Sequence, residues 1–154
     1  MSMDHVAIMK PSWKLIPKIL SGEKTIESRW YKARFAPWNR IKAGDNIYFK
    51  DSGKPITAMA RVKNVLSFEH PREKELLHLL KTYAGNSGIC LNGTPQTVLP
   101  WAKMRPYIIL VFLKNPQSIT PFEIHKTGFG NACAWMTVET IDSIKKANII
   151  PNKP

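Results

Sequence analysis

The stretch that decides the fold reads Gly22-Glu23-Lys24-Thr25-Ile26-Glu27-Ser28-Arg29-Trp30. Its residues alternate in character, which is typical of a β-strand that presents one polar face. In such a strand Glu27 and Arg29 point the same way, with Thr25 beside them. Lys24 stands at the start of the strand, just after a glycine that lets the chain turn. The pattern predicts a polar site for an anion or a polar ring, and the alternative is a solvated strand face.

Length and composition predict one globular domain. The chain has 154 residues, of which 44% are hydrophobic and 22% charged, and this is enough for a single buried core. We expect the domain to occupy residues 1–154, with its core within 5–150 and a loose tail at 151–154.

The charge balance favours a polyanionic partner. The formal net charge is +12, which favours binding of nucleic acid or nucleotides. Solubility alone, or attraction to an anionic membrane, would also account for such an excess. The longest apolar run, residues 107–113, is too short to span a bilayer, and no apolar leader is visible. We therefore expect no membrane association and a cytoplasmic protein, or a nuclear one in a eukaryote.

No cofactor or metal is expected. Cys90 and Cys133 are the only cysteines, and they form neither a C-x-x-C pair nor a zinc-binding spacing with the four histidines. Those histidines are scattered, and each is expected to be structural. His70 and His125 stand in predicted loops, so either is also a candidate to reach the polar site.

Hydrophobic periodicity and turn residues predict short alternating elements. Helices are expected after Ser12 as N-cap up to residue 20, from Pro71 to about residue 83, across 94–104, and across 140–147. An Asn115-Pro116 turn is expected to end the strand before it, with a short extended piece following at 119–123. The predicted strands lie at residues 6–9, 24–29, 46–50, 56–66, 107–114 and 132–138.

Residues 30–40 combine aromatic and basic side chains in a segment that Pro37 marks as a loop. Aromatic faces stack on nucleobases while arginine and lysine meet phosphates. Trp30, Tyr31 and Arg34 are therefore candidate ligand contacts. The alternative is that the aromatic rings fold inward and the cations only solvate the loop.

The central stretch also resembles a known motif. Gly22, Lys24, Glu27 and Arg29 match the G-x-K-x-x-E-x-R signature of the ASCH (activating signal cointegrator homology) family. The neighbouring elements agree, with a strand at 6–9, then Lys-Pro at 10–11, a helix, the signature, and Gly-Asp at 44–45 before another strand. The resemblance covers residues 5–68.

The resemblance implies an α+β fold, a small PUA-like β-barrel of about six strands with flanking helices. It implies an RNA- or nucleotide-binding domain with a cleft beside the signature, acting in RNA metabolism or in the regulation of transcription or translation. Some similar proteins are hydrolases, either amidohydrolases that deacylate a modified cytidine or ribonucleases. A third possibility, open from the charge alone, is a protein-interaction module for an acidic partner.

The expected ligand-binding residues are Lys24, Thr25, Glu27, Arg29, Trp30, Tyr31 and Arg34. If the protein is an enzyme, Lys24 and Glu27 are the catalytic candidates. The amidohydrolase branch resembling this motif uses the signature lysine, a threonine at the glutamate position and a further glutamate downstream. Lys24 matches that lysine, Glu27 replaces the threonine, and Glu69 is the candidate downstream acid.

Overall fold

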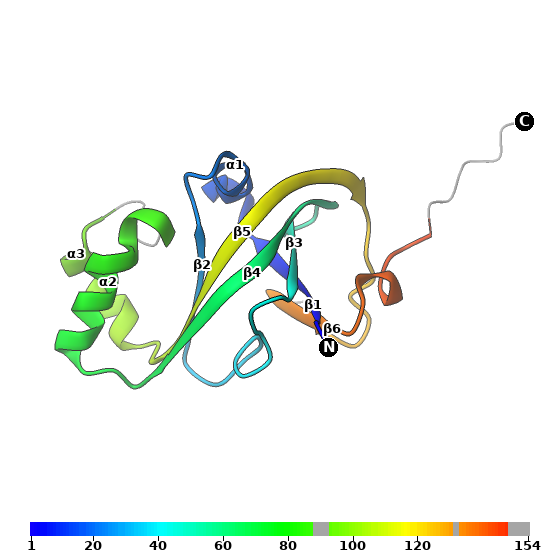
Figure 1. The fold of residues 1–154 in the computed structure, drawn as a ribbon. Helices are drawn as coiled ribbons and strands as arrows, with labels where there is room; N and C mark the ends of the chain where they lie inside the picture. The colour runs from blue at the N-terminus through cyan, green and yellow to red at the C-terminus, as the bar shows by residue number, and fades with distance from the viewer. Residues whose placement is uncertain (88–92, 131–132, 148–154) are drawn as a thin grey trace, which may run out of the picture.

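The protein is described here by a computed structural model that covers residues 1–87, 93–130 and 133–147. It has an α+β fold in which one six-stranded sheet curls into a half-barrel with helices around it (Figure 1). The strands follow the order β2-β5-β4-β3-β1-β6 across the sheet. They are β1 (Asp4–Met9), β2 (Ile26–Tyr31), β3 (Asn46–Asp51), β4 (Ile56–Glu69), β5 (Tyr107–Phe122) and β6 (Trp135–Val138).

Two long curved strands, β4 and β5, form the middle of the sheet (Figure 1). Both strands curve because register shifts interrupt the β4–β5 pairing, and such bulges bend a strand. The turn predicted at Asn115-Pro116 is wrong, because β5 continues through it. Between the pairs Arg61–Lys114 and Met59–Gln117, β5 carries one residue more than β4. A bulge therefore absorbs the asparagine and the proline.

The first helical region differs from its prediction. Ser12 lies within a 3-10 turn, η1 (Pro11–Trp13), and is not the N-cap of the helix that follows. That helix, α1 (Leu15–Ser21), begins after Lys14. The left-handed φ of Lys14, 52°, separates the 3-10 turn from the α-helix. Pro17 thereby falls in the first turn, where its missing N–H costs no helical hydrogen bond. Gly22 ends the helix at φ 84°, as predicted.

The remaining helices are α2 (Glu73–Ser87) and α3 (Pro95–Lys103). The helix predicted across 94–104 is confirmed as α3, and the Thr94 side chain caps it by accepting from the N–H of Thr97 in a capping box. The closing helix predicted for 140–147 is wrong, because only a 3-10 turn, η2 (Ile141–Ser143), forms there. The predicted tail at 151–154 lies outside the described residues. Among the described residues, no helix is both long and apolar enough to cross a membrane.

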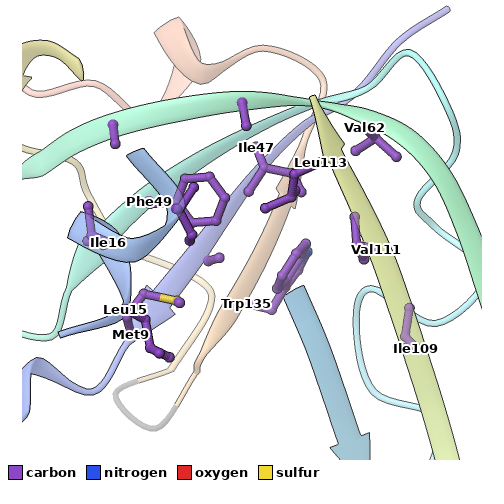
Figure 2. Packing of buried hydrophobic residues seen from close by; sticks show 14 residues of the cluster. Met9, Leu15, Ile16, Ile47, Phe49, Val62, Ile109, Val111, Leu113 and Trp135 are labelled. Atoms are coloured by element: carbon purple, nitrogen blue, oxygen red, sulfur yellow. The ribbon is translucent and has the colours of Figure 1, made fainter. Parts of the chain in front are cut away.

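The main core fills the concave side of the half-barrel. Phe49 and Ile47 of β3, Val111 of β5 and Trp135 of β6 pack there against α1 (Figure 2). Burial of such aliphatic and aromatic side chains contributes about 1.5–3 kcal/mol each relative to an exposed side chain. This packing fixes α1, and with it the turn at Gly22 that leads into β2.

Two smaller cores cover the other faces. Leu76 and Leu80 of α2 and Ala102 of α3 pack on Ile26 and Ile108 of the β2–β5 pair. Across the sheet, Phe122 at the end of β5 and the segment after it, with Ile124 and Ile144, cover β1 and β3. Strand β2 is thus held between the helix pair on one face and the concave core on the other.

Candidate functional site

The two faces of β2 have different chemistry. Ile26 is buried against α2 and α3, and Trp30 packs on that same side against Trp101 of α3. The alternate residues Glu27 and Arg29 point into the concave side, and an ion-pair contact links them. The shared face predicted for Glu27 and Arg29 is therefore confirmed.

Arg29 reaches across the open side of the half-barrel. Strands β2 and β6 are the two edges of the curled sheet. From β2, Arg29 Nη1 donates to the carbonyl oxygen of Ala134 over 3.2 Å, and Nη2 donates to that of Ile8 over 3.5 Å. Its guanidinium carbon lies 5.0 Å from the centre of the Trp135 ring, within the range of a cation–π contact. Arg29 thus links β2, at one edge of the sheet, to β1 and to the residue just before β6 at the other edge.

Lys24 and Glu27 are both 4% exposed and complete the group. Lys24 Nζ donates to the carbonyl oxygen of Ile26 over 2.6 Å. Glu27 Oε1 lies 3.9 Å from Lys24 Nζ and 3.9 Å from Arg29 Nε, which is beyond hydrogen-bonding distance. We call Lys24, Glu27 and Arg29 the signature cluster.

Two atoms of the signature cluster lack hydrogen-bond partners among the described residues. They are Glu27 Oε2 and Arg29 Nε, and both are buried. An unpaired buried polar atom costs about 1–3 kcal/mol, and more when the group is charged. Such atoms are rare in folded proteins and call for a partner outside the chain, either an ordered water or a ligand. Glu27 Oε2 can therefore accept a hydrogen bond from a ligand, and Arg29 Nε can donate one.

Burial shapes the acid–base behaviour of the site. It lowers the pKa of Lys24 below the ordinary value of 10.5, while Glu27 opposes the shift and Arg29 adds to it. Burial also raises the pKa of Tyr31 above its usual 10.0, with the Arg29 charge acting in the opposite sense. Tyr31 follows Arg29 on the same face of β2 and keeps its phenol proton at neutral pH.

A buried hydrogen-bond network supports the far wall of the site. His5 Nε2 donates to Asp45 Oδ2 over 2.8 Å, and His5 Nδ1 accepts the indole N–H of Trp135 over 3.1 Å. Asp45 also accepts the backbone N–H groups of Met3 and Lys42. Since Nδ1 accepts, the imidazole is neutral, and burial accordingly lowers the pKa of His5 below 6.5. The network fixes the ring on which Arg29 lies.

The remaining predicted residues do not gather with the signature cluster. Thr25 is exposed and precedes β2. Trp30 lies on the helix side of the strand. Arg34 forms an ion pair with Glu69 in the exposed loop region, with its guanidinium over the Tyr107 ring. Of the aromatic loop candidates, only Tyr31 shares the face of Arg29.

We also searched the described residues for metal-binding groups, reactive histidines and pockets outside the signature cluster. The described residues hold no group of three or more metal-binding side chains. His70 contacts Tyr107, and the exposed His78 bonds to Thr82 in α2. A pocket lies apart from the signature cluster, between the α2 and α3 regions, and is lined by Pro71, Glu73, Leu76, Ala102, Lys103 and Pro106.

Sequence reasoning missed Trp135 and the carbonyl groups of Ile8 and Ala134. The strand at residue 135 was expected, but its position opposite β2 depends on how far the sheet curls. That curl comes from bulges along β4 and β5, which leave no clear mark in the sequence. No local signal would have assigned these residues to the site.

The chain was compared with known proteins. No family model matches it, and no curated protein sequence matches it. The crystal structure of an ASCH protein from Zymomonas mobilis superposes with a TM-score of 0.62 at 15% identity, over 93% of this chain and 96% of that one. Two mutant forms of the Zymomonas mobilis protein each give a TM-score of 0.63, at 15% and 14% identity, over 91% of this chain and 93% and 91% of theirs.

The chain has an ASCH-type fold. Together with the observed elements, this likeness confirms the expected α+β fold, a small barrel-like sheet of six strands with flanking helices. At 15% identity the likeness shows the fold alone. The structure of this chain places the signature cluster on the concave face of β2, and the chemistry of the site follows from the geometry of these side chains.

Proposed function

We propose that the protein binds RNA or a nucleotide at the signature cluster. The observation that carries the proposal is the pair of unpaired buried atoms, Glu27 Oε2 and Arg29 Nε. Together they offer one acceptor and one donor beside a half-buried Tyr31 ring. Nucleobases present such complementary donors and acceptors along their edges.

The surface charge supports a nucleic-acid ligand. The chain carries a formal charge of +12, and exposed cations such as Arg61, Lys63 and Lys114 lie on β4 and β5. Cations of this kind attract a phosphate backbone without reading its sequence. The signature cluster then supplies a directed contact within a generally attractive surface.

The test is the affinity for a labelled single-stranded RNA, followed by fluorescence anisotropy from about 50 mM to about 200 mM salt. Arg29→Ala should weaken binding about tenfold or more, because a charged hydrogen-bond donor is lost. Arg61→Ala removes the same charge from an exposed site and should have a smaller effect. Thermal unfolding of each variant shows whether it is folded, and Arg29→Lys serves as a milder change that keeps the charge.

Two results would overturn the proposal. One is equal RNA affinity of the wild type and the Arg29→Ala variant. The other is no RNA binding at any salt concentration, which would favour an acidic protein partner for the basic surface.

A hydrolase is the second candidate, and burial of Lys24 favours it. The lowered pKa of Lys24 brings its ammonium closer to releasing a proton near neutral pH, as a general base requires. Alternatively, Glu27 activates a water while Lys24 and Arg29 stabilise the developing oxyanion. Lys24 Nζ and Arg29 Nε each lie 3.9 Å from Glu27 Oε1, so either route uses neighbouring groups.

The enzyme candidate is tested by turnover. Purified protein is incubated with acylated cytidines and short RNAs, and the products are followed by mass spectrometry. Product that disappears with Lys24→Ala would establish the hydrolase, provided that circular dichroism shows the variant folded. Equal product from both proteins would point to a contaminant, and no product would leave a binding module.

A further inference from the structure

Nε is the Arg29 nitrogen that lacks a partner among the described residues, and it is buried. The Nη1 and Nη2 atoms of Arg29 donate to the carbonyl oxygens of Ala134 and Ile8, at the opposite edge of the sheet. Arginine usually binds phosphate through two parallel N–H groups. Here both terminal nitrogens already bond within the half-barrel, so Nε is the nitrogen without a partner that a ligand can meet.

Glu27 restricts the ligand further. Glu27 is buried, and its Oε2 atom has no partner among the described residues. An ionised carboxylate only accepts hydrogen bonds, and it repels a phosphate placed next to it. The ligand must therefore bring a donor to Glu27 and an acceptor to Arg29 Nε, which lies 3.9 Å from Glu27 Oε1.

We infer that Glu27 and Arg29 bind the hydrogen-bonding edge of a nucleobase and not a phosphate group. This inference rests on the proposed function and names the part of the ligand that the signature cluster recognises. The edge of a base places an N–H donor beside a carbonyl oxygen or ring nitrogen. The N–H donates to Glu27 Oε2, and the adjacent acceptor takes the N–H of Arg29. The phosphates then lie outside, along the surface cations.

The approach to this pair is from the guanidinium side. The Arg29 side chain is 13% exposed and that of Glu27 is 5% exposed, so the base edge arrives over Arg29. Tyr31 is half-buried, lies two residues along the same face of β2 and forms a side-chain hydrogen bond with Arg29. Its ring offers a stacking surface beside an entering base.

The deciding experiment compares a single-stranded RNA with an abasic ribose-phosphate oligomer of the same length and charge. Dissociation constants are measured for the wild type and for Glu27→Gln. The wild type should prefer the base-bearing strand at least tenfold. Glu27→Gln should bring that preference close to one while leaving the affinity for the abasic strand unchanged or slightly improved. Glu23→Gln removes an exposed carboxylate from the same stretch and should keep the preference.

The outcomes separate this inference from the proposed function. Equal wild-type affinity for the two strands, together with a loss on Arg29→Ala, would keep the binding function and overturn base recognition in favour of phosphate. A preference that survives Glu27→Gln would place base recognition elsewhere and leave the two unpaired atoms to a buried water. Failure of both strands to bind would overturn the function and the inference together.

The salt dependence gives a second readout. Each phosphate contact contributes about 0.7 to the slope of log affinity against log salt for a single strand. Arg29→Gln should lower the affinity for RNA about tenfold without changing this slope, because a base contact releases no counterion. A slope reduced by about 0.7 would assign Arg29 to a phosphate and overturn the inference.

Discussion

The indole N–H of Trp135 donates to Nδ1 of His5 over 3.1 Å. The same indole ring carries the guanidinium of Arg29 on its face. His5 in turn donates a hydrogen bond to the buried Asp45, so the hydrogen-bond chain runs from Trp135 through His5 to Asp45. A buried network thus sets the orientation of the ring that supports the site, which links the stability of β1 and β6 to the position of Arg29.

Trp135→Phe separates these two roles. Phenylalanine keeps a ring beneath Arg29 but loses the N–H donor to His5. We expect the free energy of unfolding to fall by about 1–2 kcal/mol, since a buried acceptor loses a partner, while RNA affinity stays within about twofold. Urea unfolding and anisotropy measure the two quantities. A large loss of binding with unchanged stability would contradict this division of roles.

Stability should decrease on mild acidification because of His5. Burial holds the folded-state pKa of His5 below its ordinary value of 6.5, so the unfolded chain binds the proton more readily. The contribution is full above about pH 6.5 and is lost as the pH falls through the lower folded-state pKa. The free energy of unfolding should drop by up to about 1.4 kcal/mol per pH unit in that range.

The control for this prediction is His5→Gln, which has no imidazole to titrate. Its unfolding free energy should be lower at neutral pH but nearly flat between about pH 6.5 and 5.5. His125→Gln changes an exposed histidine and should retain the wild-type pH profile. The same steep profile in His5→Gln would assign the acid sensitivity to other groups.

The turn between α1 and β2 should be sensitive at Gly22. Its φ of 84° lies in the left-handed region, so Gly22→Ala should destabilise the protein by about 1 kcal/mol. Gly85 of α2 has ordinary backbone angles, and an added Cβ would meet no atom within 4 Å. Gly85→Ala should therefore stabilise by about 0.4–1 kcal/mol. Equal effects of the two substitutions, measured by urea unfolding, would argue against this account of the turn.

Ligand binding should raise the thermal stability through the signature cluster. RNA at about one hundred times its dissociation constant stabilises the folded state by about 2.7 kcal/mol. This corresponds to a rise in melting temperature of about 5–10 °C for a domain of this size. The shift should be absent for Arg29→Ala at the same RNA concentration. An equal shift in both proteins would place the RNA elsewhere.

The sequence predicts the elements of this fold better than their three-dimensional arrangement. Alternation identifies the polar face of β2, and Gly22 marks its start, because both are local properties of the chain. The continuation of β5 through Pro116 is not local, since the bulge depends on pairing with β4. Thr140 begins only a short turn, because the Ile124–Lys145 bridge draws the following residues into strand-like pairing.

The site shows the same division. Lys24, Glu27 and Arg29 become candidates through strand alternation and the resemblance to the ASCH signature, while Trp135 enters only because the curled sheet brings its two edges together. Trp30 belongs to the loop candidates by composition, yet its parity in β2 turns it toward Trp101 and α3. Periodicity therefore assigns a side chain to a face, and tertiary packing decides what that face meets.

The most direct test follows the indole N–H of Trp135 by NMR during titration with a single-stranded RNA. This proton lies beneath Arg29 and is one of five indole signals. We expect its resonance to shift in proportion to saturation, while the indole signal of Trp13, which is exposed near the start of α1, stays in place. A stationary Trp135 signal under conditions where RNA is bound would contradict binding at the signature cluster.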